Sequence, residues 1–283
     1  MRVMIISYMG EDPAVQERRV REHDIQLKWL SQVLPKSPVH ILAQRYKEEW
    51  FRKGPVYKVR SKSSPLLLPG FARNELLKEF YRSSDEWGLL LDNDAMLYQH
   101  QDGPTIFAHM QKFSARWSGV DIWVPLDPRN EPFSKRLTDP LYRKNIELRK
   151  CGLSIKGSMY VLRRPVSKDK IFFQETLDKG FAGEDGMFVA DAVIAGWACY
   201  VCTTVVLREV VSGKYTTIKT LEESRRSGGK EMMELSRKMF LGRYGQHGLI
   251  LQSGKGGRTR FSTKHFFRRY WRHPDRVLIS KRG

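Results

Sequence analysis

Short apolar stretches alternate with amphipathic stretches along most of the chain, and this alternation constrains the fold more than any other feature of the sequence. The apolar stretches have the length and composition of buried strands, whereas the amphipathic stretches have the spacing of helices. The pattern predicts the α/β class, with a mostly parallel central sheet flanked by helices. The expected strands span residues 3–8, 39–43, 88–91, 121–125, 158–162 and 198–206. The expected helices span residues 14–34, 72–81, 105–117, 184–195 and 232–244.

The last part of the chain differs from the rest in composition. Residues 254–283 contain ten basic residues and one acidic residue, with five aromatic residues among them. We therefore expect a globular domain over residues 1–250 and a basic, aromatic C-terminal extension over residues 251–283. Phe267, Tyr270 and Trp271 share one helical face, which predicts a helix that docks on the domain with its arginines outward. Basic residues interleaved with aromatic ones equally suit phosphate contacts combined with stacking on bases or sugars. Residues 54–70, with three prolines, are expected to form a long irregular connection.

The chain as a whole is strongly basic, with 50 Lys and Arg against 31 Asp and Glu and a formal net charge of +19. Such an excess favours a polyanionic partner, either nucleic acid or an anionic membrane surface, over a generally basic protein with no such partner. No apolar run approaches the length of about 18 residues that spans a bilayer. The apolar stretch at the N-terminus is shorter than the core of a signal peptide, about 7–15 residues, so a cytoplasmic protein is expected.

The three cysteines, Cys151, Cys199 and Cys202, are too few for a disulfide framework in a chain of 283 residues. Cys199 and Cys202 have the spacing of a metal or redox motif. They lie, however, in a β-branched and aromatic stretch that is typical of a strand, and the sequence contains no second pair. We therefore interpret these cysteines as buried structural thiols.

Two carboxylates, Asp92 and Asp94, directly follow the apolar stretch at residues 88–91. Side chains at i and i+2 of an extended segment lie on one side, so both acids are expected to face one ligand at the carboxyl edge of the sheet. Carboxylate oxygens suit Mg²⁺ or Mn²⁺, which commonly bridge protein acids to substrate phosphates. A turn without any ligand is the alternative. Arg73, near the start of the preceding helix, is expected to pack beside these acids or else to be an ordinary surface charge.

A second acidic pair, Glu184 and Asp185, lies between Gly183 and Gly186 at the expected start of a helix. Acids in a first helical turn are favoured by the helix dipole, and this alone is sufficient to explain them. The functional alternative is a carboxylate that orients or deprotonates an acceptor hydroxyl.

Residues 1–250 resemble the GT-A fold glycosyltransferases in the order of four features. These are the N-terminal strand, the helix with Arg73, the strand followed by acids, and the acidic pair between glycines. The resemblance implies a Rossmann-related sheet, a UDP-sugar donor and a Mn²⁺ or Mg²⁺ ion on the donor diphosphate. It also implies a nucleotide-sugar site formed by Ser7, Tyr8, Arg73, Asp92 and Asn93. By the same resemblance Asp94 and His247 would hold the metal, and Glu184 or Asp185 would be catalytic at the acceptor.

Within that family, the modest size and the basic character resemble the DNA sugar transferases of T-even-type bacteriophages, and most of all the β-glucosyl-hydroxymethylcytosine α-glucosyltransferase type. This resemblance implies transfer of glucose from UDP-glucose to hydroxymethylcytosine, or to its glucosylated form, in phage duplex DNA. Transfer of arabinose to modified DNA is an open alternative. The residues expected to contact DNA are Lys255, Arg258, Arg260, Lys264, Arg268, Arg269 and Arg272.

Two other functions remain open at this point. A GT-A enzyme could build an envelope or lipid-linked saccharide, with its basic and aromatic tail on an anionic membrane. A DNA-binding protein without catalysis would use the acids only as helix caps and turn residues.

Overall fold

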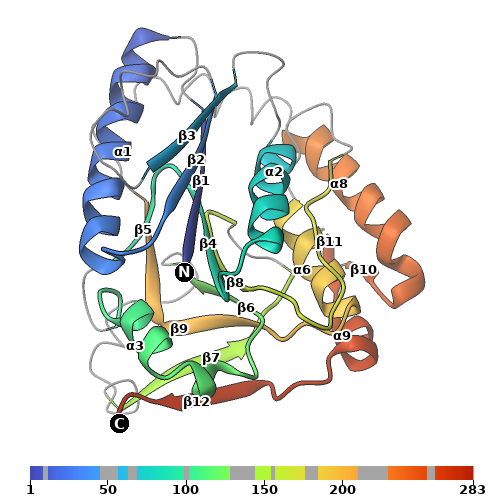
Figure 1. Cartoon of the computed structure of the whole chain (residues 1–283). Helices are drawn as coiled ribbons and strands as arrows, with labels where there is room; N and C mark the ends of the chain where they lie inside the picture. The colour runs from blue at the N-terminus through green and yellow to red at the C-terminus, as the bar shows by residue number, and fades with distance from the viewer. Residues whose placement is uncertain are drawn as a thin grey trace.

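The computed structural model describes residues 1–8, 12–44, 57–62, 69–98, 102–127, 144–153, 157–175, 184–209, 229–253 and 259–282. These residues form a ten-stranded sheet with helices packed around it, and a separate two-stranded hairpin (Figure 1). The sheet contains β1 (Arg2–Tyr8), β2 (Val39–Gln44), β3 (Tyr57–Lys62), β4 (Trp87–Asp92), β5 (Ala95–Leu97), β6 (Ile122–Leu126), β7 (Asn145–Lys150), β8 (Met159–Arg163), β9 (Cys199–Glu209) and β12 (Arg276–Ser280). The hairpin pairs β10 (Ile250–Ser253) with β11 (Thr259–Ser262).

The helices cover most of the segments that the sequence predicts to be helical. They are α1 (Pro13–Val33), α2 (Pro69–Arg82), α3 (Ile106–Lys112), α6 (Glu184–Ile194), α8 (Gly229–Tyr244) and α9 (Lys264–Tyr270), with the 3-10 turns η2 (Ser114–Trp117) and η3 (Gly245–His247). The start of α1 follows from its sequence, because the Asp12 side chain accepts a hydrogen bond from the Ala14 backbone N at 2.8 Å and Pro13 occupies the first turn. The expected helix 105–117 is divided, since α3 ends at Lys112 and η2 continues as a 3-10 turn.

One half of the sheet is parallel, with the strand order β3-β2-β1-β4. Residues of β2 are buried throughout, as expected for strands covered on both faces. The register of β1 on β4 sets Ile6 beside Asp92, so the last residues of β1 lie at the same edge as the acids that follow β4. This half confirms the sequence prediction and creates the carboxyl edge at which α/β proteins bind ligands.

The other half corrects the expectation of a mostly parallel sheet. Strand β8 is antiparallel to both β4 and β6, β6 is parallel to β9, and β7 is antiparallel to both β9 and β12. The sheet is therefore mixed. The strands that make it mixed include β7, in which charged residues interrupt the apolar ones, and β12, whose apolar run is only three residues long.

The segment at residues 54–70, expected to be an irregular connection, contains the strand β3 and the start of α2. Strand β3 pairs in parallel with β2 and forms the end of the sheet. Its sequence, Tyr-Lys-Val-Arg-Ser-Lys, is basic at alternate positions, which is compatible with an edge strand but hides the strand from a hydrophobicity pattern.

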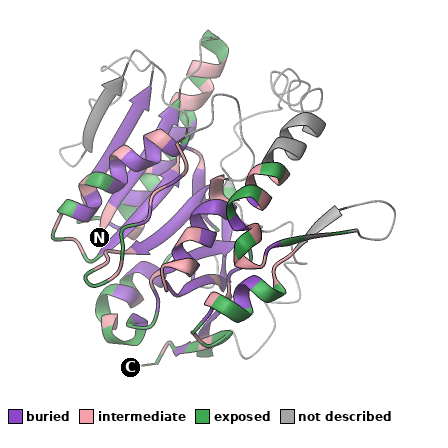
Figure 2. Cartoon of the chain, turned by 90° about the vertical axis from the view of Figure 1, so that its right-hand side faces the viewer, coloured by how far each residue is buried: buried purple, intermediate pink, exposed green. Residues whose placement is uncertain are grey.

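The core lies between the sheet and its helices, and Figure 2 shows the strands as the most continuously buried part of the molecule. Phe173 stacks on Phe188 with ring centroids 4.1 Å apart, and Tyr160 meets both rings edge-on. Cys151, Cys199 and Cys202 are buried and unbridged, as the sequence predicted. Burial raises the pKa of Cys202 to about 12, so this thiol stays protonated at neutral pH.

The C-terminal extension is built into this architecture. Strand β12 completes one end of the main sheet by pairing with β7, and α9 buries the aromatic side chains of Phe266, Phe267 and Trp271. Trp271 meets Tyr200 of β9 edge-on at a centroid distance of 5.5 Å. Among the described helices, none combines the length and the apolar character needed to cross a bilayer.

Candidate functional site

A buried arginine, Arg73 of α2, organises the acids at the carboxyl edge of the sheet. Its Nη2 donates to Asp92 Oδ1 at 2.9 Å and to the Gly157 carbonyl at 3.0 Å. Its Nη1 donates to Asp185 Oδ1 at 3.1 Å and lies 3.6 Å from Glu184 Oε1. One guanidinium therefore connects α2, the end of β4, the segment before β8 and the start of α6.

The charge balance of this cluster favours a permanently cationic arginine. The Arg73 side chain is only 4% exposed, and burial by itself opposes a charged guanidinium. Asp92 and Asp185 outweigh that penalty and raise the pKa of Arg73 above its ordinary value. The Tyr160 hydroxyl donates to Asp185 Oδ1 at 2.7 Å, and burial together with Asp185 raises the pKa of Tyr160, which keeps it a hydrogen-bond donor.

Two glycines permit the close approach of these groups. A Cβ atom at Gly157 would lie 1.6 Å from Asp185 Oδ1, so no side chain fits there without displacing that carboxylate. A Cβ atom at Gly186 would lie 2.4 Å from the Leu153 carbonyl oxygen. The glycine after the acidic pair is thus required by packing at the start of α6.

Helix α1 holds the turn formed by Asp92, Asn93 and Asp94. Gln26 Nε2 donates to the carbonyl oxygens of Asp92 and Ala95, both at 2.7 Å. Arg19 Nη1 donates to Asn93 Oδ1 at 3.2 Å and lies 3.5 Å from Asp94 Oδ2. The acidic turn is therefore fixed by two side chains that are more than sixty residues away in sequence.

The remaining members of the expected donor site reach the same edge. Ser7 is buried and Tyr8 is exposed at the end of β1, one and two residues beyond the position that pairs with Asp92. The structure thus brings together Ser7, Tyr8, Arg73, Asp92, Asn93, Asp94, Glu184 and Asp185.

His247 lies in another environment. Its Nδ1 shares a short hydrogen bond with the Tyr270 hydroxyl, and its ring contacts those of Tyr244 and Tyr270. These contacts place His247 between α8 and α9. Within the described residues, no group of three or more His, Cys, Asp or Glu side chains is arranged to hold a metal ion.

The donor atoms at the acidic turn do not fit the expected metal. Asp92 is bound to Arg73, and Asp94 has a guanidinium 3.5 Å from one of its oxygens. A divalent cation held by Asp94 would therefore be repelled by the adjacent positive charge of Arg19. Of the two expected metal ligands, Asp94 and His247, only Asp94 lies at this edge, and the Arg19 guanidinium already contacts it.

Sequence reasoning missed Arg19, Gln26, Gly157 and Tyr160 as parts of this site. Arg19 and Glu22 have the spacing of an ordinary helical ion pair, which conceals the contact of Arg19 with the acidic turn. Gly157 and Tyr160 follow no motif. A polar residue on the buried side of α1, such as Gln26, was the one available signal.

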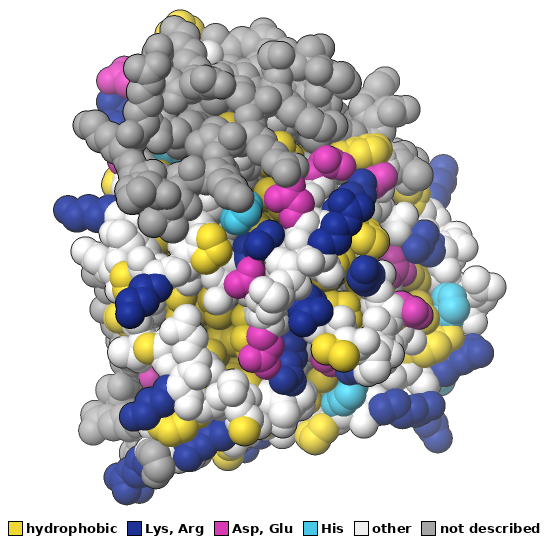
Figure 3. All heavy atoms as spheres, in the orientation of Figure 1, with side chains coloured by type: hydrophobic (Ala, Val, Ile, Leu, Met, Phe, Trp, Pro, Cys, Tyr) yellow, Lys and Arg dark blue, Asp and Glu magenta, His cyan; other side chains and the backbone are white. Residues whose placement is uncertain are grey.

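The expected DNA-contacting residues are distributed as follows. Lys264, Arg268, Arg269 and Arg272 are exposed on or just after α9, and Arg260 belongs to β11. Lys255 and Arg258 lie outside the described residues. On the face shown in Figure 3, Lys and Arg side chains are scattered and lie among Asp and Glu side chains.

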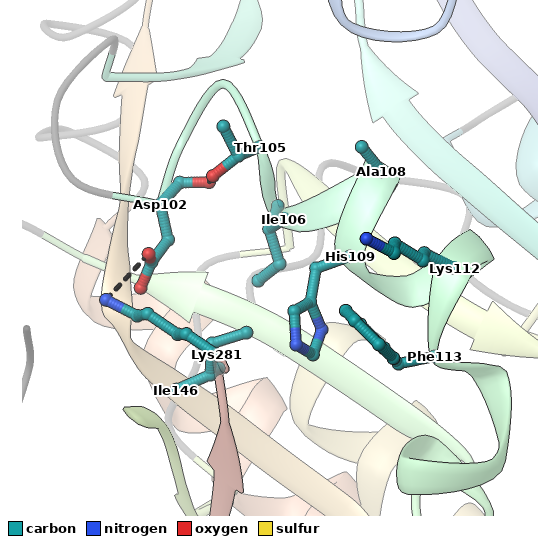
Figure 4. A pocket seen from close by; sticks show the side chains of 9 residues that line it. All are labelled: Asp102, Thr105, Ile106, Ala108, His109, Lys112, Phe113, Ile146 and Lys281. Carbon is teal, nitrogen blue, oxygen red and sulfur yellow. Dashed lines mark hydrogen bonds and ion pairs between the residues drawn. The ribbon is translucent and has the colours of Figure 1, made fainter. Parts of the chain in front are cut away.

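A pocket of about 250 Å³ lies elsewhere, between α3 and the end of β12 (Figure 4). Its wall includes His109 and Lys112 of α3, and the Asp102–Lys281 ion pair, 2.7 Å long, lies at one side. None of the residues that line this pocket belongs to the Arg73 cluster.

Neither a family model nor a curated protein matches this chain. Among solved structures, TarS of S. aureus has a TM-score of 0.48 and 16% identity over 75% of this chain, which spans 37% of the TarS chain. A197 from STIV has a TM-score of 0.35 and 15% identity, covering 75% of this chain and 87% of its own. CMP:2-keto-3-deoxy-manno-octonic acid synthetase, complexed with CTP, has a TM-score of 0.40 and 10% identity, covering 81% of this chain and 98% of its own. At such values, none of these likenesses assigns an activity to the chain.

Proposed function

We propose that this protein is a glycosyltransferase that uses a nucleotide-sugar donor. The observation that carries the proposal is the Arg73 cluster, in which one buried cation binds three carboxylates at the carboxyl edge of the parallel half of the sheet. The side chains of Asp92, Glu184 and Asp185 are 29%, 18% and 22% exposed, so the acids line the surface of that edge while the arginine lies beneath them. This arrangement suits an uncharged, hydroxyl-rich ligand.

The residues divide into positioning and reacting groups. Asp185 Oδ1 accepts from both Tyr160 and Arg73, and a backbone hydrogen bond from Gly157 also reaches this carboxylate. Glu184 makes the longer contact with Arg73, at 3.6 Å. We therefore assign Asp185 to the positioning of Arg73, and Glu184 to the acceptor hydroxyl as its hydrogen-bond partner and base.

The chemistry requires stabilisation of two developing charges. When the bond between the sugar and the diphosphate breaks, negative charge grows on the leaving phosphate and the sugar becomes oxocarbenium-like. The carboxylates of Asp92 and Glu184, at the carboxyl edge, stabilise the cationic sugar. Arginine side chains at the same edge stabilise the negative charge on the phosphate. Ser7 and Tyr8, at the end of β1, are assigned to the nucleoside.

We propose modified duplex DNA, carrying hydroxymethylcytosine or its glucosylated form, as the acceptor, and UDP-glucose as the donor. The net charge of +19 and the exposed Lys264, Arg268, Arg269 and Arg272 support phosphate contacts. Three of the aromatic residues of the extension, Phe266, Phe267 and Trp271, are buried in the protein and so do not support base stacking or insertion into a membrane. This burial disfavours the alternative of a saccharide-building enzyme with an aromatic tail in a membrane.

The test is incubation with radiolabelled UDP-glucose and plain, hydroxymethylated or glucosylated duplexes, and in parallel with a lipid-linked or envelope saccharide. Label on one of the modified duplexes, with none on plain DNA, is the expected result. UDP-arabinose in place of UDP-glucose distinguishes the two donor sugars. Label on the saccharide and on no duplex would contradict the proposal of a DNA acceptor but not the proposal that the protein is a glycosyltransferase.

The role of α9 is tested by neutralising Arg268 and Arg269 together. We expect the Arg268→Gln/Arg269→Gln protein to bind duplex DNA more weakly, with a log–log salt slope reduced by about 2, because about two phosphate contacts are lost. Hydrolysis of the donor in the absence of DNA should be unchanged. The matched control is Lys28→Gln/Lys36→Gln, which removes two exposed charges from the N-terminal part of the chain. Equal weakening by both pairs would show that α9 has no special role.

A further inference from the structure

We propose that Arg19 takes the place of the divalent metal, so that the diphosphate of the donor is bound by a guanidinium and transfer proceeds without a metal ion. This inference rests on the proposed function as a nucleotide-sugar transferase. It departs from the metal that the sequence resemblance implies, and it concerns a residue that the sequence analysis did not single out.

The first argument is the position of Arg19. Its Nη1 lies 3.2 Å from Asn93 Oδ1 and 3.5 Å from Asp94 Oδ2, at the turn where a metal ligand was expected. The cation reaches this turn from α1, a different element from the one that carries Arg73. Each of the two aspartates of the turn therefore has its own arginine partner, Arg73 for Asp92 and Arg19 for Asp94.

The second argument is how firmly Arg19 is held. Glu22 is 3% exposed, and its carboxylate lies 3.2 Å from Arg19 Nη1 and 3.4 Å from Arg18 Nε. A buried acid on the same helix thus orients the Arg19 guanidinium toward the turn. A side chain fixed in this way needs little reorganisation when an anion arrives, which is the condition for effective electrostatic stabilisation.

The third argument is the presence of buried donors that lack an acceptor. Arg19 Nε and Asn93 Nδ2 are among the buried polar side-chain atoms without a hydrogen-bond partner in the described part of the chain, and they belong to two residues that contact each other. Buried donors are normally satisfied, so two at one turn indicate a missing acceptor. Phosphate oxygens accept strong charge-assisted hydrogen bonds from such groups, whereas a metal ion cannot accept a hydrogen bond at all.

The reaction balances without a metal. The bond between the anomeric carbon of the sugar and the phosphate oxygen breaks, and its electron pair stays on the nucleoside diphosphate beside Arg19. The acceptor hydroxyl oxygen forms the new bond to the anomeric carbon, and its proton passes to the Glu184 carboxylate. Arg19 supplies the positive charge that the departing diphosphate requires.

The test is calorimetric titration of UDP into the purified protein in excess EDTA, in Mg²⁺ and in Mn²⁺. We expect the three dissociation constants to agree within about twofold. Arg19→Ala should weaken UDP binding in EDTA by about 10-fold or more, since charge-assisted hydrogen bonds are lost. Arg21→Ala is the matched control, because Arg21 lies on the same helix but pairs with exposed Glu17, and it should change binding by less than about twofold. Arg19→Lys, which keeps the charge, is measured alongside in case the alanine variant unfolds.

The Asp94→Asn variant distinguishes a metal-bound diphosphate from an Arg19-bound one, because the two predict different changes in UDP affinity. If Asp94 binds a metal, the asparagine variant loses affinity for UDP in Mn²⁺. If Arg19 binds the diphosphate, removing the adjacent negative charge leaves UDP binding unchanged or makes it severalfold tighter. Mn²⁺ binding, followed by electron paramagnetic resonance, should be absent at stoichiometric concentration.

UDP binding that disappears in EDTA and returns with Mn²⁺ would overturn this inference and leave the glycosyltransferase proposal standing. Wild-type affinity in Arg19→Ala would overturn it as well. A protein that binds no UDP under any of the three conditions would overturn the proposed function itself, and with it the role assigned to Arg19.

Discussion

Among the arginine–carboxylate clusters of the described residues, those centred on Arg73 and on Glu147 are built in opposite ways. At the carboxyl edge, the cation is buried, with Arg73 only 4% exposed, and its acids reach the surface. In the β7–β9–β12 part of the sheet the acid is buried, with Glu147 0% exposed, and Arg149 and Arg276 are 50% and 49% exposed. The position of the buried partner thus decides which charge is presented to solvent.

This difference indicates that the Arg73 cluster can form a ligand site, whereas the Glu147 cluster connects strands. Glu147 accepts from Thr203 Oγ1 at 2.8 Å and pairs with Arg276 Nε at 2.6 Å, so it joins β7 to β9 and to β12. Thr203, Arg149 and Arg276 belong to strands of the sheet, and the Glu147 side chain is closed to solvent. The Arg73 cluster also joins several elements, but it leaves acid oxygens at an accessible edge where a ligand can meet them.

The largest effect is expected from Arg73→Met. Without the guanidinium, Asp92 and Asp185 are left as partly buried, unbalanced acids, and the free energy of unfolding should fall by about 3–5 kcal/mol. UDP binding and sugar transfer should be lost as well. Urea unfolding and calorimetry measure the two effects, and Arg73→Lys serves if the methionine variant does not fold.

Arg149→Met is the matched control from the other cluster. Its guanidinium is half exposed, and Glu147 keeps Arg276 and Thr203, so the change should cost less than about 1 kcal/mol. If Arg73→Met and Arg149→Met had the same free energy of unfolding, burial of the cation would not determine how much each cluster stabilises the fold.

Glu147→Gln should have the next largest effect. The amide keeps the size of the side chain but removes the charge that Arg149 and Arg276 bind, so the free energy of unfolding should fall by about 1.5–3 kcal/mol. UDP affinity should stay within about twofold of the wild type, because the described contacts of this cluster lie in the β7–β9–β12 part of the sheet. Loss of UDP binding in a folded Glu147→Gln protein would show that the two clusters are coupled.

The features that sequence analysis predicted correctly are those with local signals. The strands before Asp92 and at the N-terminus are apolar runs, and the acids follow directly on a strand, so their meeting at one edge follows from the topology of parallel strands. The position of Arg73 beside Asp92 is equally local, because one helix, one turn and one strand separate them.

The features that it missed depend on distant contacts. Arg19 and Tyr160 reach the site from elements whose place is set only when the sheet is assembled. Strands β7 and β12 are short and carry charged residues, so their apolar signal is weak and their place is set by pairing with each other and, for β7, with β9. The assignment of His247 to a metal came from resemblance alone, and the structure places this residue against Tyr270.

Gly157→Ala tests the closeness of packing at the Arg73 cluster. A Cβ atom 1.6 Å from Asp185 Oδ1 forces that carboxylate away from Arg73, and overpacking of this kind costs about 1–3 kcal/mol. Sugar transfer should fall with it, since Asp185 positions the guanidinium. Gly119→Ala is the control, because no atom lies within 4 Å of a Cβ atom there, and its effect should stay within about 0.5 kcal/mol.

The smallest effect concerns His23, a histidine on the buried side of α1. Burial, with a smaller contribution from Arg19, lowers the pKa of His23 to about 3. Below about pH 6.5 His23 is therefore protonated in the unfolded chain but neutral in the folded chain. The free energy of unfolding consequently falls as the pH is lowered, by up to about 1.4 kcal/mol per pH unit. Urea unfolding between pH 7.5 and pH 5.5 measures this slope.

The slope should flatten in His23→Gln and persist in His265→Gln, whose imidazole is exposed. Equal slopes in both variants would mean that other groups cause the loss of stability. A flat profile in the wild type would mean that His23 binds its proton equally well in the folded and the unfolded protein, and hence that its burial on α1 does not lower its pKa.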